Sequence, residues 1–189
     1  LNIEEGVKII SVYDNIVDYI LVKQGAKINA VGTPDKPIVM TSEKEEPGAW
    51  GGIHICGKAH TNAEGGKGSS EIGGAVYGGN DDADNSGTLQ YIRLEYTGFA
   101  FDEEHEANGI SFYGVGNGTI VDHCEAYKGS DDGFEFFGGS VNVSNMVVVS
   151  CSDDSFDWTE GWNGKGTNLV AYQEAESTLG YDCDCLMEC

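Results

Sequence analysis

The stretch Ser130-Asp131-Asp132-Gly133-Phe134-Glu135-Phe136 returns 22 residues later as Ser152-Asp153-Asp154-Ser155-Phe156-Asp157-Trp158. Both copies have the same order of residue types: serine, two aspartates, a small residue, phenylalanine, an acid and an aromatic. A weaker copy lies upstream, where residues 108–112 align with residues 132–136 at a separation of 24. Self-similarity with a period of about 20–25 residues is typical of solenoid proteins. The repeat therefore predicts the fold and also the place to look for chemistry.

The composition favours many short strands joined by tight turns. The 189 residues include 28 glycines but only 3 prolines, and no stretch keeps a helical apolar period over three turns. Strands are predicted at residues 9–12, 19–22, 26–31, 38–41, 52–56, 89–96, 110–113, 119–127, 134–137, 141–149, 156–158 and 168–172. No helix long enough for a βαβ crossover separates them. We predict an all-β protein, a right-handed parallel β-helix with rungs of about 22–24 residues.

One β-helix domain is expected over residues 1–180. Residues 64–86, rich in glycine and aspartate, are predicted to leave the coil as an excursion. Residues 181–189 form a cysteine-rich tail, and since the chain begins at Leu1 we expect a processed part of a longer protein. Disulfides are expected in the tail, with a connectivity that the spacing does not decide. The candidate cysteines are Cys56, Cys124, Cys151, Cys183, Cys185 and Cys189.

The side chains of the repeat divide between two faces. Because side chains alternate along a strand, Phe134 and Phe136 share one face, where we expect aromatic rings to stack from rung to rung. Ser111, Glu135 and Asp157 then lie on the outward face, one above another at about 4.8 Å. Stacked carboxylates repel one another unless something neutralises them.

The charge is uneven along the chain. The formal net charge is −22, of which residues 1–80 carry −3 and residues 81–189 carry −19. A surface this acidic disfavours nucleic acid and anionic membranes as partners, and no apolar run reaches the 18 residues of a membrane span. Cations are the natural counter-ligand, and the alternative is a solvated acidic face that keeps the protein soluble.

A turn at residues 82–87 has the spacing of half a calcium loop. Asp82, Asp84 and Ser86 place oxygen side chains at positions 1, 3 and 5, and a glycine follows at position 6. A closing carboxylate has to come from elsewhere, and the candidates are Asp81, Glu95 and the run at residues 102–104. The alternative is a turn whose side chains cap their own backbone.

The two Asp-Asp steps are expected to meet. Successive rungs would bring Asp132 and Asp154 within one strand spacing, where two carboxylates share either a proton or a cation. We predict Ca²⁺ as the cofactor, held by Asp132 and Asp154 and by the turn of Asp81, Asp82, Asp84 and Ser86. The alternative is a ladder in which each aspartate accepts hydrogen bonds from amides of the next rung.

Five motifs lie at residues 25–42, 47–53, 77–89, 91–98 and 131–139. They resemble a family of exported right-handed β-helix surface proteins and lipoproteins that is abundant in Bacteroidetes and marine bacteria, and the resemblance covers roughly residues 1–172. It implies an extracellular or cell-surface location and a β-helix fold. The family has no agreed activity, so the resemblance says little about function, and the cysteine-rich tail departs from its pattern.

A second resemblance supports an enzymatic alternative. Clustered aspartates on a β-helix resemble polygalacturonase-type glycoside hydrolases, which would assign acid and base roles among Asp131, Asp132, Asp153, Asp154 and Asp157. Two partners of that site are missing, a Gly-His-Gly step and an Arg-Ile-Lys step. A lyase would need a basic residue, and residues 81–189 offer only Arg93, Lys128 and Lys165.

The function we favour is non-enzymatic. An extracellular structural or adhesive module would present a rigid surface to a glycan, to a protein or to a second copy of the chain. Trp162 and Tyr172 are candidates for a sugar-stacking platform beside the acidic edge. The polysaccharide-active enzyme is the alternative.

Overall fold

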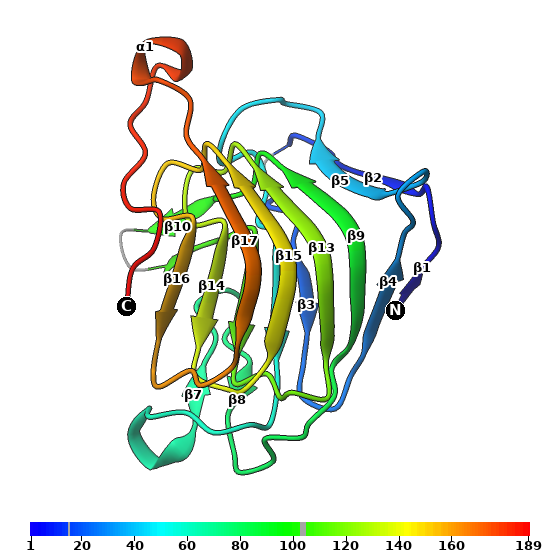
Figure 1. Cartoon of the computed structure of the whole chain (residues 1–189), viewed down its shortest axis with the longest axis vertical. Coiled ribbons are helices and arrows are strands. Elements are labelled where there is room, and N and C mark those ends of the chain that lie inside the picture. The colour runs from blue at the N-terminus through cyan, green and yellow to red at the C-terminus, as the bar shows by residue number, and fades with distance from the viewer. Residues whose placement is uncertain (15, 103–104) are drawn as a thin grey trace.

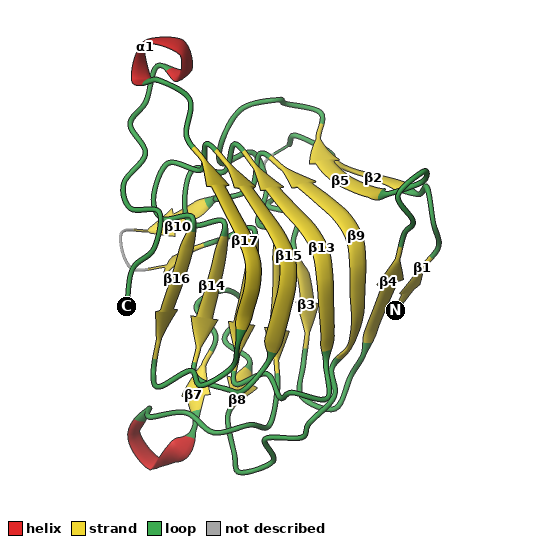
Figure 2. Cartoon of the chain, in the orientation of Figure 1, coloured by secondary structure: helices red, strands yellow, loops and turns green. Residues whose placement is uncertain are grey.

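The computed structural model describes residues 1–14, 16–102 and 105–189, and it is a parallel β-helix (Figure 1, Figure 2). The two acids Glu103 and Glu104, considered above as closing carboxylates, lie outside the described residues. One parallel sheet runs in the order β1-β4-β9-β13-β15-β17, with β5 between β2 and β9. The other runs in the order β16-β14-β12-β6-β3. The predicted fold class is confirmed.

The strands of the large sheet include the longest of the chain. They are β1 (Asn2–Ile3), β2 (Lys8–Ser11), β4 (Ile28–Val31), β5 (Ile38–Ser42), β9 (Gly87–Glu95), β13 (Ile120–Tyr127), β15 (Asn142–Val149) and β17 (Gly166–Tyr172). The second sheet contains β3 (Ile20–Val22), β6 (Ile53–Cys56), β12 (Ile110–Tyr113), β14 (Phe134–Phe137) and β16 (Phe156–Thr159). Two antiparallel hairpins lie outside these sheets: β7 (Gly68–Ser69) with β8 (Val76–Tyr77), and β10 (Ala100–Asp102) with β11 (His105–Glu106).

The repeat period appears directly in the strand register. Phe134 of β14 lies beside Ile110 on one side and beside Phe156 on the other, which are 24 and 22 residues away. The predicted rung length is confirmed for these coils. Earlier coils are longer: Ile53 lies beside Ile110, 57 residues later, because both hairpins are inserted between β6 and β12.

Stacked aromatic rings fill the interior where the repeat predicts them. The rings of Phe112 and Phe136 are nearly parallel, with centroids 5.0 Å apart, and those of Phe134 and Phe156 are 5.8 Å apart. All four side chains are buried. Burial of each contributes about 1.5–3 kcal/mol, and each aromatic pair adds about 0.5–1.5 kcal/mol. This interior fixes the position of the acidic residues on the opposite face.

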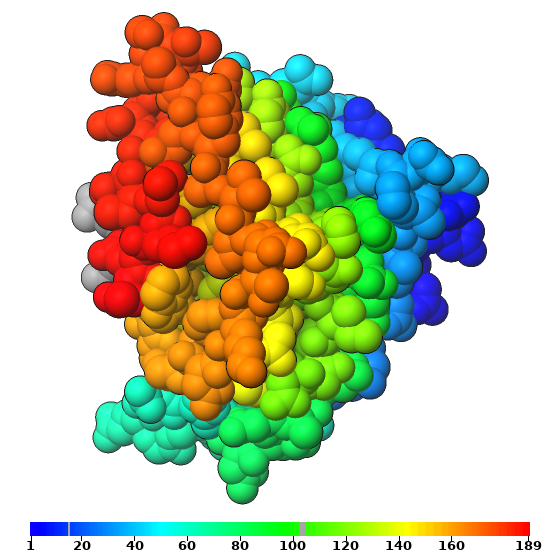
Figure 3. Space-filling model, viewed as in Figure 1, coloured from blue at the N-terminus to red at the C-terminus, as the bar shows by residue number. Residues whose placement is uncertain are grey.

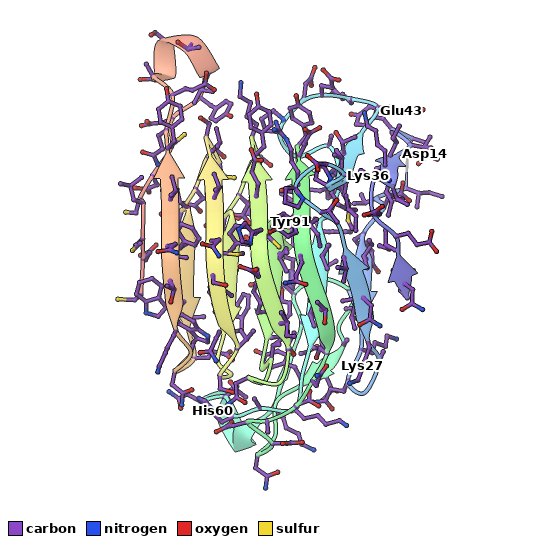
Figure 4. The ribbon with its side chains drawn as sticks, turned by 45° about the vertical axis from the view of Figure 1, so that its right-hand side comes forward. Asp14, Lys27, Lys36, Glu43, His60 and Tyr91 are labelled. Atoms are coloured by element: carbon purple, nitrogen blue, oxygen red, sulfur yellow. The ribbon has the colours of Figure 1, made fainter. Side chains whose placement is uncertain are left out.

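The long strands bend at a column of residues with left-handed backbone. Tyr91, His123, Asn145 and Asn168 have φ between 51° and 55° and interrupt four successive strands. The rings of Tyr91 and His123 stack at 4.5 Å, and Asn168 donates to Asn145 at 2.9 Å. Tyr91 is labelled on this broad sheet in Figure 4. The register of β9, β13 and β15 is the same on both sides of this column, so the strands bend together without a bulge.

The C-terminal tail returns to the second sheet. The short helix α1 (Glu176–Leu179) projects from one end of the molecule, and the chain then runs along the flank beside β16 (Figure 1, Figure 3). Glu188 forms a parallel bridge with Asp157. The tail therefore covers the edge at which the five-stranded sheet ends. Among the described residues, no helix has the length and hydrophobicity that a membrane crossing requires.

The predicted disulfides are not supported, since all six cysteines are free thiols. Cys56, Cys124 and Cys151 are buried, and burial raises the pKa of their thiols to about 11, 12 and 12. Cys56 packs in a small cluster with Tyr113, whereas Cys124 belongs to the main core. Half of the cysteines thus act as small apolar side chains of the interior, at positions dictated by packing.

Candidate metal centre

Nine acidic side chains line one cavity of about 200 Å³ on the outer face of the second sheet. No basic or neutral side chain is among the lining residues in the described part of the chain. They are Glu71, Glu106, Asp131, Asp132, Glu135, Asp153, Asp154, Asp157 and Glu188. The repeat supplies six of these residues, and the other three come from segments that fold over it.

The corner between the two sheets brings the Asp-Asp steps together, as the repeat predicts. Asp132 and Asp154 occupy the same position in successive coils, and the N–H of Asp154 donates to Oδ1 of Asp132 at 2.9 Å. Asp154 accepts in turn from the N–H of Cys185 in the tail at 2.7 Å. Asp131, Asp132 and Asp154 are all buried. Each ladder bond occupies one carboxylate oxygen, and a carboxylate has a second oxygen that can bind another ligand.

The strands that follow the corner add a second row of acids. Ser111, Glu135 and Asp157 are register partners on β12, β14 and β16, as their alternation predicts. Glu135 accepts a hydrogen bond at Oε2 from Nδ2 of Asn108 at 2.6 Å. This face points away from the interior of the coil. It is nevertheless covered, as the absence of any exposed surface on Ser111 shows.

Asn108 lies beside Glu135, one of the lining acids, and carries an unsatisfied polar atom. It takes the place of Asp132 and Asp154 in the preceding coil, and only 1% of its surface is exposed. Its Nδ2 donates to Glu135 and to Oγ of Ser111, whereas its Oδ1 receives no hydrogen bond. A buried acceptor without a donor costs about 1–3 kcal/mol. A water molecule next to this oxygen would satisfy it.

Three peripheral segments close the cavity. Glu71 comes from the excursion, where it accepts a hydrogen bond from the hydroxyl of Tyr113 at 3.3 Å. Glu106 comes from β11 and Glu188 from the tail. The backbone of Glu188 is fixed because its N–H donates to the carbonyl of Phe156 at 3.1 Å. The excursion, the hairpin and the tail thus each contribute one carboxylate to the centre.

Burial and mutual repulsion raise the pKa of these acids. Burial is the main cause for Asp131, Asp132 and Glu135, whose pKa rises to about 8, 9 and 10, and repulsion from neighbouring carboxylates adds to it. Burial likewise raises the pKa of Glu71 to about 7. The pKa of Asp153 is raised for the same two reasons. Asp131, Asp132 and Glu135 therefore hold protons at neutral pH or else require a cation to ionise.

The spacing of the carboxylates suits a shared cation. Candidate ligand oxygens lie within 4.8 Å of one another in three groups of acids: Asp131, Asp132 and Asp153; Asp132, Glu135 and Asp157; Asp154, Asp157 and Glu188. Oxygens around one Ca²⁺ lie 2.3–2.6 Å from the ion, so about 5 Å is the largest separation of two ligands. An acid-only donor set fits a hard cation such as Ca²⁺ better than a transition metal. Asp132 and Asp154, the predicted pair, are both part of this centre.

The predicted turn at residues 81–86 lies elsewhere, and its side chains serve the backbone. Oδ1 of Asp82 accepts from the N–H of His60 at 3.1 Å, and Oδ2 of Asp84 accepts from the N–H of Lys58 at 3.0 Å. Asp81 caps the N–H of Ala83 at 3.3 Å. Asp82 also contacts the ring of His60, labelled in Figure 4, at 2.8 Å. The structure does not bring these acids together with Asp132 and Asp154.

The two aromatic candidates do not form one platform. The ring of Trp162 stacks on Phe136 at 4.5 Å, and its Nε1 donates to the carbonyl of Val141 at 3.1 Å. It lines an apolar cavity of about 260 Å³ at the end of the core, together with Trp158. Tyr172 is 59% exposed on the last strand and is not among the residues of that cavity.

Three residues of the centre escaped prediction: Glu71, Glu106 and Glu188. The carboxylates of the excursion, the hairpin and the tail lie outside the repeat, so the period gives no signal for them. Asn108 was visible as the uncharged counterpart of Asp132 in the repeat. That alignment alone places it at the same corner.

A family model described as a pectate-lyase like beta helix domain matches residues 1–188. The chain therefore belongs to this family, in agreement with the two parallel sheets and their stacked interior. Neither the curated proteins nor the solved structures give a significant match.

Proposed function

We propose that this chain is a calcium-binding structural or adhesive β-helix module that works in the extracellular space or on a cell surface. The observation that supports the proposal is the cavity lined by nine acids and, within the described part of the chain, by no base. Ca²⁺ would bind oxygens of Asp132, Glu135 and Asp157 and relieve the repulsion among them. It would also hold Glu71, Glu106 and Glu188, and with them three peripheral segments, against the coil.

The shape of the rest of the molecule supports a presenting role. The parallel sheets form a rigid solenoid whose last strand, β17, pairs only with β15 among the described strands. Val170 and Tyr172 on this strand are 53% and 59% exposed. An unpaired edge is a template for a strand of another chain. A second copy or a surface protein or glycan is the partner proposed for this surface.

A polysaccharide-active enzyme is the second candidate, because one observation favours it. Asp131, Asp132 and Glu135 have a raised pKa, as a general acid requires at neutral pH. Two observations favour the first candidate. The acids of the cavity form groups whose oxygens lie within 4.8 Å of one another, a spacing that suits a shared cation. No arginine or lysine lines the cavity to bind a uronate, among the residues that the structure describes.

Thermal unfolding with and without calcium, combined with a polysaccharide panel, separates the two functions. Ca²⁺ at 100 times its Kd stabilises a protein by about 2.7 kcal/mol, or roughly 5–10 °C for a chain of this size. The module is expected to lose that increment in EGTA and to leave every polysaccharide intact. Release of reducing ends that Asp132→Asn abolishes would establish the enzyme instead. Identical melting in Ca²⁺ and EGTA would refute calcium binding.

A further inference from the structure

The exposed apolar side chains of the molecule are concentrated at the two ends of the solenoid. Among the described residues, eleven of the fifteen large apolar side chains that are exposed lie in residues 1–19 or 170–187. At the first end they are Leu1, Val7, Ile10, Val12, Tyr13, Ile16 and Tyr19, and at the last end Val170, Tyr172, Leu186 and Met187. Repeat proteins stay soluble through end repeats with a polar outer face. These two ends present apolar surface instead.

Both ends also have free strand edges. Among the strands that the structure describes, β1, β2 and β3 each pair with one strand only, and β17 pairs only with β15. β1 and β17 form opposite edges of the large sheet (Figure 1). In the second sheet the C-terminal tail takes the last position, where Glu188 bridges to Asp157 in parallel. Free edges present unpaired N–H and C=O groups, which are a template for another chain.

The two ends are equivalent in strand register, so one can continue the other. The pairing of successive strands leads from Ile9 to Ala171 through Met40, Leu94, Ala126 and Val148. Ile9 and Ala171 thus occupy the same position of the first and last coils, and so do the next residues, Ile10 and Tyr172. A second copy whose first coil lies on this last coil would place Ile10 beside Tyr172, and these side chains are 48% and 59% exposed.

The second sheet is matched in the same way. Ile20 of β3 belongs to the register column that ends at Phe156 of β16. Met187 takes the next position of this column, since the following residue bridges to Asp157. Ile20 lines an apolar cavity of about 100 Å³ at the first end, and Met187 lines the cavity of about 260 Å³ at the last end. A stacked copy would therefore bring the two ends of the apolar core together.

The charges of the ends favour contact between unlike ends. Residues 1–27 hold three lysines and four acids, a net charge of −1, whereas residues 160–189 hold one lysine and six acids, a net charge of −5. Two last coils would repel each other more strongly than a last coil and a first coil. A contact between unlike ends is heterologous, and copies that follow one another along the solenoid axis do not close into a ring.

We propose that copies of this 189-residue chain associate head to tail, with the first coil of one copy, β1 to β3, on β17 and the C-terminal tail of the next. This inference rests on the structural role proposed above, and it names a second copy as the partner of the β17 edge. The stacked copies form an open chain in which both parallel sheets continue from one copy to the next.

Sedimentation velocity in Ca²⁺ and a thiol reductant measures the association without cross-links between exposed cysteines. Wild type is expected to form species larger than a dimer that grow as the protein concentration is raised. Ile10→Lys and Tyr172→Lys are each expected to be monomeric, since a lysine on an edge blocks strand addition. An equimolar mixture of the two is expected to form dimers only, because each variant keeps one intact end. The control Val76→Lys, on the excursion and 55% exposed in wild type, is expected to associate as wild type does.

Three results would overturn the head-to-tail contact. Wild type could remain monomeric at every concentration, or its growth could stop at a dimer. Ile10→Lys could also associate by itself, which would mean that two last coils bind each other. Val170→Lys provides a second variant of the last end and is expected to behave as Tyr172→Lys does.

Thermal unfolding of the same samples in Ca²⁺ and EGTA tests the proposed function separately. Monomeric wild type that keeps its calcium response would overturn the head-to-tail contact and leave calcium binding standing. Wild type without a calcium response would refute the proposed function, whatever its state of association. Melting of the lysine variants within a few degrees of wild type shows that their association is lost at the surface and not through unfolding.

Discussion

Oδ1 of Asp132 accepts a hydrogen bond at 2.9 Å from the backbone N–H of Asp154, which lies one coil further along the chain. The same two residues line the acidic cavity. The bond joins neighbouring coils through one carboxylate oxygen and leaves the other oxygen for a cation. The amide ladder and the calcium site, which the sequence presents as alternatives, are compatible at this corner.

Replacement Asp132→Asn is expected to stabilise the cation-free protein and to remove most of its response to calcium. Asparagine keeps the Oδ1 acceptor for Asp154 but takes one acid out of a repelling, buried group. In EGTA at pH 8 the gain should be at least about 1 kcal/mol, or roughly 2–4 °C in Tm. Thermal unfolding followed by circular dichroism checks both parts. A variant with the calcium response of wild type would contradict the assignment.

The cation-free protein is expected to lose stability as the pH rises from 5 to 9. The folded-state pKa of Asp131 and Asp132 is about 8 and 9, above the value near 4 of an unfolded chain, so the folded state binds more protons in this interval. The free energy of unfolding therefore decreases as the pH rises, and this loss of stability is absent below about pH 4. Urea unfolding in EGTA at several pH values measures the decrease. Stability that rises between pH 5 and 8 would contradict this account.

Replacement Asp82→Asn is expected to leave the number of bound calcium ions unchanged. Asp82 accepts hydrogen bonds from the backbone and ring of His60, and the acids of its turn are apart from the cavity. Asparagine keeps the Oδ1 acceptor for the N–H of His60, so the change removes only the charge beside the His60 ring, and an exposed ion pair contributes about 0–1 kcal/mol. Calcium analysis after dialysis against a low-calcium buffer checks the prediction. A calcium ion lost from Asp82→Asn but kept in Asp132→Asn would place the site at the turn.

Replacement by alanine is expected to destabilise the protein at Trp162 and to leave its stability almost unchanged at Tyr172. Trp162 is half-buried and stacks on Phe136 of the core, so Trp162→Ala should cost about 1–3 kcal/mol. Tyr172 is largely exposed, and Tyr172→Ala should change stability by less than about 0.5 kcal/mol. Chemical unfolding of both variants measures the two costs. A small cost at Trp162 would show that its ring is available as a ligand-binding surface after all.

The repeat predicts the positions of the residues that lie in the repeated coils. Phe134, Phe136, Asp132 and Asp154 lie where the period of 22 residues places them, because stacked coils force equivalent residues together. The period gives no information about Glu71, Glu106 and Glu188, which are brought to the cavity by tertiary folding of three inserted or terminal segments. The same limit applies to Trp162, whose glycine-rich turn indicated exposure although its ring packs on the core. Local composition does not report such contacts.

Calorimetric titration of calcium into the metal-free chain tests the acidic cavity most directly, with Asp132→Asn and the exposed control Asp35→Asn measured beside wild type. Wild type and Asp35→Asn are expected to bind with a Kd at or below about 10⁻⁴ M, within the range of extracellular calcium sites. Asp132→Asn is expected to bind at least about tenfold more weakly, a loss of about 1.4 kcal/mol. No saturable binding by wild type, or equal affinity in all three proteins, would contradict the central claim.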